Sequence, residues 1–287
     1  MDELLPDTVS VAEVFGDPPA PALHPWEEAI VGDSVAKRRR EFAIGRGCAR
    51  KALSRLGSPP APLLSGSRGE PLWPAGVVGA ITHCDGYCAA VVARRHDIVG
   101  VGVDAEPAKP LPAGILEAVS LPEERARLPR PAGRAQRAPW DRLLFSAKES
   151  VYKVWFPLTG RSLEFEEASV TFHPEGDGPA EHGAAEGASD SRGTGSGRGT
   201  GTGSGRGTGK EAGEPPAGGT FSVRILATPW RLGDRTLSAL TGRFLVRDGV
   251  LLTCIAVPAA GRALPGRRAA FYQSAPARAQ SALWESS

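Results

Sequence analysis

Two carboxylates follow an apolar run in the segment VGVDAEP, residues 101–107. If this run is a β-strand, Asp104 and Glu106 lie on the same side of it, because side chains alternate along a strand. Proteins bind Mg²⁺ through one or two carboxylates, while water and phosphate oxygens fill its other positions. The carbonyl oxygen of Ala105, between the two acids, is a further candidate ligand. By itself the pattern is more typical of two solvated acids at a strand end, so other residues must support a metal site.

A third carboxylate lies in the segment FSAKESVYKVW, residues 145–155. The apolar positions recur at helical spacing, and Lys148, Glu149 and Lys153 lie off the apolar stripe or at its edge. Glu149 and Lys153 could form an ordinary surface pair, worth about 0.3 to 0.5 kcal/mol. The helix is too apolar, however, for this face to be freely solvated. We therefore expect Glu149 to complete the metal site and Lys153 to neutralise charge on a transferring phosphate.

A hydroxyl and an imidazole follow another apolar run in the segment ITHCDGYCA, residues 81–89. Thr82 and His83 can both donate hydrogen bonds to phosphate oxygens, although a lone histidine is more often structural. Cys84 and Cys88 have Cys-x₃-Cys spacing, and no second pair of zinc ligands follows them. We expect both cysteines to be small core residues rather than metal ligands.

These residues need helices and strands to bring them together. A basic helix is predicted over 36–57, with Arg38 and Arg46 two turns apart and close to one face. A polar loop rich in turn residues follows at 63–76. One small sheet is predicted from three apolar, β-branched runs at 77–81, 89–93 and 99–103.

The rest of the chain continues with a helical region and further strands. The helical region is predicted over 114–156, and strands are predicted at 168–172, 221–226, 243–247 and 250–257. Asp248-Gly249 is a strong hairpin signal between the last two strands. The order predicts an α+β protein of two pseudo-symmetric halves, each a small, mostly antiparallel sheet packed with a long helix. We place the N-terminal half at 1–105 and the C-terminal half at 106–260.

A glycine-rich insertion interrupts the second half at about 174–219. It has too little apolar surface to offset the entropy of ordering, so we expect it to be disordered, as we do the tail at 261–287. The glycines of its repeat occupy odd positions only, which excludes GxGxxG, and Gly209-Lys210 is followed by Glu211 instead of Ser or Thr. The insertion therefore does not encode a phosphate-binding loop.

Composition excludes several classes of protein. Lys and Arg number 34 against 32 Asp and Glu, which argues against a nucleic-acid binder that works through bulk charge. No apolar run approaches the roughly 20 residues of a membrane span. Four cysteines and an acidic N-terminus, MDELLPDTVS, predict a reduced cytoplasmic protein without a secretory signal. Any anion that the protein binds must be met by a local cluster of charge.

The motifs THC, VGVDAEP and FSAKESVYKVW, in this order and at these separations, resemble those of the phosphopantetheinyl transferases of the Sfp/EntD type. The resemblance covers about residues 38–257 without the insertion. It implies the fold of that family and the transfer of the 4′-phosphopantetheine arm of coenzyme A to a serine of an apo acyl or peptidyl carrier protein, with release of adenosine 3′,5′-bisphosphate. It also implies Mg²⁺, with Mn²⁺ as a substitute, and a monomer.

The resemblance also assigns metal ligands and catalytic residues. Asp104 and Glu106 are the implied metal ligands, and Ala105 contributes through its backbone. Glu149 either binds the metal or takes the serine proton, directly or through water. Lys153 is the implied contact of the coenzyme A pyrophosphate.

Further coenzyme A contacts are implied along the first half of the chain. Arg38 and Arg46 correspond to the contacts of the 3′-phosphate, although the run Lys37-Arg38-Arg39-Arg40 leaves open which basic residue of 37–40 meets it. Thr82 and His83 are the implied phosphate contacts, and Leu163 lines the pantetheine channel. The implied adenine and ribose contacts are Ser65, Gly66, Ser67 and Arg68, which precede Gly69-Glu70-Pro71.

Two other hypotheses remain open from the residues alone. A metal-dependent phosphohydrolase acting on a pyrophosphate like that of coenzyme A could use the same carboxylates with water as the acceptor. A catalytically silent module could bind coenzyme A or a carrier protein, although the intact acids and Lys153 argue against it. The residues do not indicate whether fatty-acid, polyketide or nonribosomal-peptide carriers are served.

Overall fold

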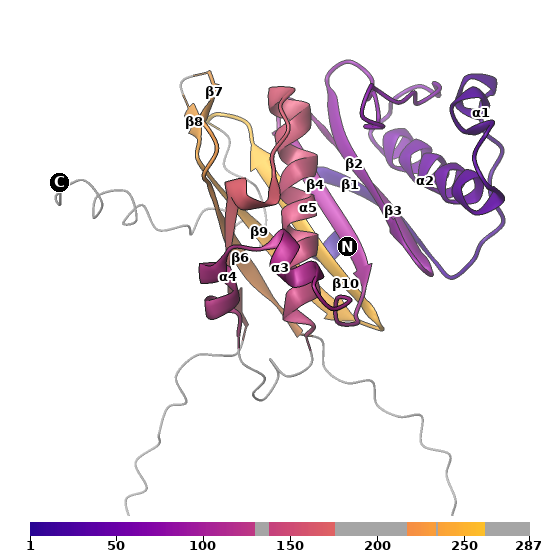
Figure 1. Cartoon of the computed structure of the whole chain (residues 1–287). Coiled ribbons are helices and arrows are strands. Elements are labelled where there is room, and N and C mark those ends of the chain that lie inside the picture. Colours follow the sequence, from indigo (N-terminus) through magenta and orange to yellow (C-terminus); the bar gives the residue numbers. More distant parts are fainter. Residues whose placement is uncertain (130–137, 176–216, 234, 262–287) are drawn as a thin grey trace, which may run out of the picture.

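Two antiparallel sheets pack face to face, and a long helix covers the outer face of each (Figure 1). The computed structural model describes residues 1–129, 138–175, 217–233 and 235–261. One core cluster lies between the two sheets, and one further cluster lies under each of the two helices. This arrangement of layers confirms the predicted α+β class.

The first sheet has three strands in the order β1-β3-β2. The strands are β1 (Val9–Phe15), β2 (Val77–Cys84) and β3 (Tyr87–Arg94). Helix α2 (Ala36–Arg55) packs on the outer face. The central strand β3 is buried on both faces, and its small apolar sequence YCAAVVAR allows close approach from the helix and from the second sheet.

The second sheet has five strands in the order β4-β10-β9-β6-β5. These strands are β4 (Ile98–Pro107), β5 (Ala168–Pro174), β6 (Ala217–Ile225), β9 (Ala239–Arg247) and β10 (Val250–Pro258). Helix α5 (Trp140–Thr159) packs on its outer face, where Leu143, Leu144 and Val151 are fully buried. The apolar stripe predicted for this helix is therefore its core face.

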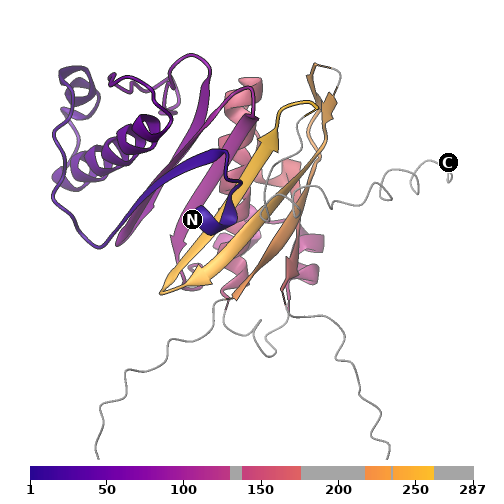
Figure 2. The same cartoon turned by 180° about the vertical axis from the view of Figure 1, so that it is seen from behind.

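Shorter elements complete the fold. At the N-terminus, η1 (Asp2–Leu4) lies against β9, as Figure 2 shows. The others are α1 (Pro25–Val31), α3 (Ile115–Val119), α4 (Pro122–Arg127), η3 (Phe165–Glu167) and the hairpin of β7 (Trp230–Leu232) with β8 (Arg235–Leu237). Within the described ranges, no helix is long and apolar enough to cross a membrane.

The structure corrects the predicted composition of the first sheet. The run at 99–103 belongs to β4, which pairs with β10 in the second sheet and not with β2 or β3. The third strand of the first sheet is instead β1, which the sequence analysis did not predict. The prediction assumed that strands adjacent in the sequence also pair in the sheet. Consecutive strands do so only about two thirds of the time, and β4 is an exception. The division into halves at residue 105 stays a prediction.

The predicted strands of the second half are confirmed. They correspond to β5, β6, β9 and β10, and both residues of the turn between the last two have positive φ, 51° at Asp248 and 77° at Gly249. This is the conformation of a two-residue hairpin of type I′. The insertion joins the paired strands β5 and β6, but residues 176–216 and the tail at 262–287 lie outside the described residues.

A glycine allows α5 to lie directly on β4. A Cβ atom at Gly102 would lie 2.1 Å from the backbone oxygen of Ser150, closer than any real contact. The helix turn that carries Glu149 and Lys153 can therefore approach the strand that carries Asp104. This close approach brings residues from two distant motifs into one site.

We expect Gly102→Ala to destabilise the protein by about 1 to 3 kcal/mol, because overpacking forces the helix backbone away from the strand. The free energy of unfolding in urea measures this loss. Gly218→Ala in β6 is a matched control, since its Cβ would make only ordinary contacts, the nearest at 3.4 Å. Equal stability of Gly102→Ala and the wild type would contradict the interpretation.

Candidate active site

The end of β4 places two carboxylates between the halves. Asp104 is 6% exposed, and its Oδ1 accepts a hydrogen bond from the hydroxyl of Thr82 at 3.2 Å. The same hydroxyl accepts the backbone N–H of Ala105 at 2.9 Å. Thr82 thereby ties β2 to β4. Its predicted contact with phosphate stays a prediction, and in this structure the buried hydroxyl holds Asp104 in place.

Lys153 supplies a positive charge directly at this carboxylate. Its Nζ donates to Asp104 Oδ1 at 2.8 Å and to the carbonyl oxygen of Val103 at 3.1 Å. The second oxygen of Asp104, Oδ2, is buried and has no hydrogen-bond partner among the described residues. A buried carboxylate oxygen without a partner is costly, so this atom is suited to bind a cation or a donor group.

Glu149 lies one helical turn before Lys153 and interacts with both acids of β4. Burial raises the pKa of its carboxyl, and the charges of Asp104 and Glu106 raise it further, while Lys153 opposes them. No hydrogen bond joins the side-chain carboxylate of Glu149 to another described residue. Three mutually repelling carboxylates, one with an unpartnered oxygen, form a set of hard donors that fits a divalent cation.

The three acids do not form a closed cage in this structure. No group of three or more His, Cys, Asp or Glu side chains in the described parts of the chain is arranged to hold a metal ion. Glu106 is engaged by Arg142 of α5, whose Nη1 donates to Oε2 at 2.6 Å. The ligand set of Asp104, Ala105, Glu106 and Glu149 therefore stays a prediction, which the chemistry of the donors supports.

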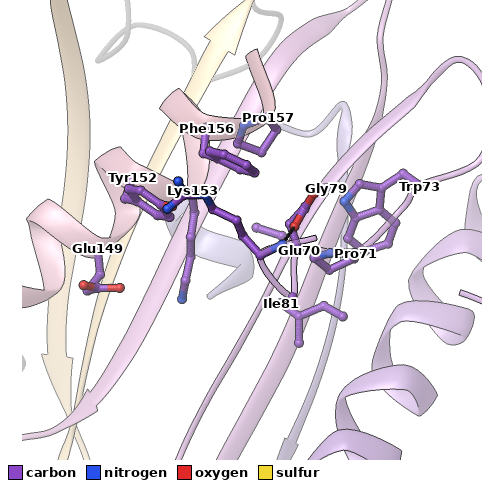
Figure 3. A pocket seen from close by; sticks show the side chains of 13 residues that line it. Glu70, Pro71, Trp73, Gly79, Ile81, Glu149, Tyr152, Lys153, Phe156 and Pro157 are labelled. Atoms are coloured by element: carbon purple, nitrogen blue, oxygen red, sulfur yellow. Dashed lines mark hydrogen bonds between the residues drawn. The ribbon is translucent and has the colours of Figure 1, made fainter. Parts of the chain in front are cut away.

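Glu149 and Lys153 open onto a cavity of about 250 Å³ between the two halves. Figure 3 shows Tyr152, Lys153 and Phe156 of α5 on one side, and Trp73 and Ile81 from the first half on the other. A second cavity of about 290 Å³ shares the following residues with the first: Arg68, Glu149 and Tyr152. Leu163 lines this second cavity, and its predicted place in a channel stays a prediction.

A buried arginine forms a second centre of positive charge in the first half. Arg46 is 4% exposed, lies over the ring of Phe42 and donates to Ser65 Oγ at 2.8 Å. Its Nε–H is buried and has no partner among the described residues. Burial lowers the pKa of Arg46 to about 10, an effect that Glu27 opposes and that Arg38 increases. An anion placed here would relieve the repulsion between Arg38 and Arg46.

The predicted loop at 65–68 is a tight turn that reaches the second half. The backbone N–H of Gly66 donates to the carbonyl of Glu70, and the N–H of Arg68 donates to the Glu70 carboxylate at 2.9 Å. A Cβ at Gly66 would overlap that carboxylate, so a larger residue here would displace the side chain of Glu70 from the turn. The guanidinium of Arg68 lies 5.6 Å from the ring centre of Phe156 on α5. This loop therefore joins the wall of both cavities.

The structure separates His83 from the cavity that Glu149 and Lys153 line. Its Nε2 lies 3.2 Å from Glu41 Oε2, and it lines a different cavity, of about 120 Å³, together with Lys37 and Arg40. A contact between His83 and phosphate stays a prediction. The structure thus brings Thr82, Asp104, Glu149 and Lys153 together, with Arg46 held against the loop at 65–68.

Two buried acids that position the site were missed from sequence. Glu27 is fully buried and accepts hydrogen bonds from the backbone of Leu63 and from Arg50, which anchors the start of the loop to α1 and α2. Glu124 accepts from Lys148 at 2.7 Å and from the backbone of Val170 at 2.7 Å. A proline followed by an acid in a first helical turn was an available signal at both places, 25–27 and 122–124.

Lys148 is a structural residue, unlike its neighbour Glu149. Its side chain is 2% exposed and pairs with Glu124, and its Nζ also donates to the carbonyl of Phe165. Burial lowers the pKa of Lys148, and Glu124 opposes this effect. The pair ties α5 to α4 and to the segment that lines the second cavity.

The comparisons with known proteins agree with this geometry. A model of the 4′-phosphopantetheinyl transferase N-terminal domain matches residues 26–93, and one of the 4′-phosphopantetheinyl transferase superfamily matches 100–196. The chain is 43% identical to 4′-phosphopantetheinyl transferase PptT of Mycobacterium tuberculosis, over 88% of this chain and 95% of that protein. It is 42% identical to Svp of Streptomyces mobaraensis, over 89% and 88% of the two chains, and 41% identical to Npt of Nocardia iowensis, over 89% and 99%. Both are also named 4′-phosphopantetheinyl transferases.

We expect Lys148→Met to destabilise the protein by about 3 to 5 kcal/mol, because it leaves Glu124 as an unpaired buried charge. Lys37→Met is the matched control. Lys37 forms an exposed pair with Glu41 at 3.9 Å, and loss of that pair is expected to cost less than about 1 kcal/mol. Urea unfolding of both variants measures the difference, and similar losses in the two would contradict a structural role for Lys148.

Proposed function

Because the chain belongs to the 4′-phosphopantetheinyl transferase family, we propose that it transfers the 4′-phosphopantetheine arm of coenzyme A to a serine of an apo carrier protein. In this reaction the serine oxygen forms a bond with the β-phosphorus, and the bond from that phosphorus to the bridging oxygen breaks. Adenosine 3′,5′-bisphosphate leaves with the electron pair of that bond. The observation that carries the proposal is that Glu149 and Lys153 line the cavity between the halves, while Asp104 is paired with Lys153 and acts on the charge of Glu149.

The carboxylates around Asp104 have the donors that a divalent cation needs. Asp104, Glu106, Glu149 and the carbonyl of Ala105 would hold Mg²⁺, or Mn²⁺ in its place. When bound, such an ion neutralises charge on the pyrophosphate and aligns its oxygens. Thr82 holds Asp104 in position for this role, and the orphaned Oδ2 of Asp104 supports it.

Glu149 is suited to take the serine proton, directly or through water. Burial and the neighbouring acids raise its pKa, which makes it a better base than an exposed carboxylate. Lys153, one turn away, would donate to the pyrophosphate and stabilise charge on the departing oxygen. No covalent enzyme intermediate is required, because in-line attack needs only positioning, a base and neutralisation of charge.

Arg46 supplies the charge for the 3′-phosphate, with Arg38 beside it. The buried guanidinium, its unpartnered Nε–H and its contact with Ser65 support a site built for an anion next to the loop at 65–68. Gly66, Ser67 and Arg68 of that loop would contact adenine and ribose. Leu163, in the second cavity, would line the path of the pantetheine arm.

The partners are acyl and peptidyl carrier proteins, which bring the serine to the second cavity. We place the enzyme in the cytoplasm. We expect it to be a monomer, since one chain contains both halves of the site.

One assay tests the proposal against its alternatives. Labelled coenzyme A is incubated with the enzyme, Mg²⁺ and apo carrier proteins of the fatty-acid, polyketide and nonribosomal-peptide types. The mass of each product is then measured by mass spectrometry.

The transferase, the phosphohydrolase and the silent binding module each predict a different outcome of this assay. Label on the carrier serine, with adenosine 3′,5′-bisphosphate in solution, supports transfer and identifies the preferred carrier class. Free phosphopantetheine with an unmodified carrier would indicate a phosphohydrolase. Binding of coenzyme A without either product would indicate a silent binding module.

We expect Glu149→Gln to lower the rate of transfer at least about 100-fold, because an amide cannot accept the serine proton and is a poor metal ligand. Binding of coenzyme A should be largely kept, since Arg46 and the loop are unchanged. Glu117→Gln, at an exposed position of α3, is the matched control and should retain full activity. A normal transfer rate in Glu149→Gln would remove this residue from the mechanism.

Arg46→Ala is expected to raise the apparent KM for coenzyme A about tenfold or more and to change kcat little, because it removes ground-state binding of the 3′-phosphate. The variant should use dephospho-coenzyme A, which lacks that phosphate, as well as the wild type does. Lys51→Ala removes an exposed charge from the same helix and controls for net charge. An equal loss with both substrates would place the 3′-phosphate elsewhere.

A further inference from the structure

Arg142, in the first turn of α5, makes three hydrogen bonds around the end of β4. Its Nη1 donates to Glu106 Oε2 at 2.6 Å, its Nε donates to the carbonyl of Lys109 at 2.6 Å, and its Nη2 donates to the carbonyl of Pro110 at 3.0 Å. The side chain is only 16% exposed. The guanidinium is therefore held in one orientation by two fixed backbone atoms and by one carboxylate oxygen.

This contact leaves the other oxygen of Glu106 available. Oε1 has no hydrogen-bond partner among the described residues, and Glu106 is on the same side of β4 as Asp104. A charged hydrogen bond to one oxygen limits the rotamers of the carboxylate and fixes where its other oxygen lies. Arg142 thus acts on Glu106 as Thr82 acts on Asp104.

Asp141, the neighbour of Arg142, provides a comparison within the same structure. Its Oδ2 accepts the backbone N–H of Leu111 at 2.7 Å, so it also ties the segment after β4 to α5. No hydrogen bond or ion pair joins it to Glu106. The two residues therefore share the tethering of this segment, but Arg142 alone of the two contacts a carboxylate of the candidate metal site.

We propose that Arg142 is a positioning residue that orients Glu106 for a divalent cation and so sets the affinity of the site for that ion. This inference rests on the proposed function, because it requires the carboxylates of β4 to bind a metal. Carboxylate ligands are generally hydrogen-bonded by outer residues, and loss of such a partner lowers metal affinity about 10- to 100-fold. The positive charge of Arg142 opposes metal binding, but its guanidinium is held on Oε2, away from the free oxygen.

Direct binding of Mn²⁺ to the full-length protein tests this proposal. Mn²⁺ is titrated into wild type, Arg142→Ala, Arg142→Lys and Asp141→Ala, each saturated with coenzyme A, and the bound ion is measured by calorimetry and by electron paramagnetic resonance. We expect Kd for Mn²⁺ to rise at least about tenfold in Arg142→Ala. Arg142→Lys should recover part of the affinity, because an ammonium can still reach Glu106.

The comparison variant separates positioning from tethering. Asp141→Ala should bind Mn²⁺ nearly as tightly as the wild type, although both alanine variants loosen the same segment. Circular dichroism before each titration confirms that the variants are folded, and Arg142→Lys keeps the test valid if Arg142→Ala does not fold. Equal or tighter binding in Arg142→Ala, or an equal loss in Asp141→Ala, would overturn the proposal.

A failure of the proposed function gives a different result. If the wild type with coenzyme A does not bind Mn²⁺, the metal site itself is absent, and the role of Arg142 is overturned together with it. If the wild type binds Mn²⁺ and the Arg142 variants bind it equally well, only the role of Arg142 is overturned.

Discussion

The close contact between α5 and β4 is the constraint on which the candidate site depends. Gly102 lets the helix backbone at Ser150 reach the strand, where any Cβ would overlap it. The contact places Lys153 within 2.8 Å of Asp104 and puts Glu149 near enough for the acids of β4 to raise its pKa. Without that approach the two motifs would belong to separate surfaces, and neither would have the charge density needed to bind a diphosphate.

Around this contact, positive and negative groups are matched at short range. Asp104 is paired with Lys153, Glu106 with Arg142 and Glu124 with Lys148. Glu149 differs from these acids, because no hydrogen bond joins its carboxylate to another described residue. A half-buried carboxylate without a hydrogen-bond partner, next to acids that are paired, is consistent with a group reserved for substrate or metal.

The two halves make different contributions to the candidate site. The second half provides the acids and the lysine on rigid elements, β4 and α5, whereas the first half provides the loop at 65–68 and the buried Arg46 that is held against it. The loop is itself held by Glu27, which connects it to α1 and α2. Under the proposed function, this division would let a small number of charged side chains bind a polyanion in a chain whose basic and acidic residues nearly cancel.

The sequence by itself determined the features that depend on local chemistry. These are the apolar stripe of α5, the hairpin at Asp248-Gly249, the strands of the second half and the motifs that resemble the phosphopantetheinyl transferases. The spacing of apolar residues and the identity of turn residues indicate such features, because both depend on interactions among a few neighbouring residues. The alternation of Val9 and Val11 in β1 was a usable signal of the same kind that the sequence analysis missed.

Only the tertiary structure decided which elements and charges meet. It assigned β4 to the second sheet and buried Lys148 against an acid 24 residues away. It paired the hydroxyl of Thr82 with Asp104, and it placed His83 beside Glu41 instead of in the cavity with Glu149. It also brought Arg142 to Glu106, across 36 residues of sequence. Partners at such separations depend on packing and loop closure across the whole chain, so spacing within a motif carries no information about them.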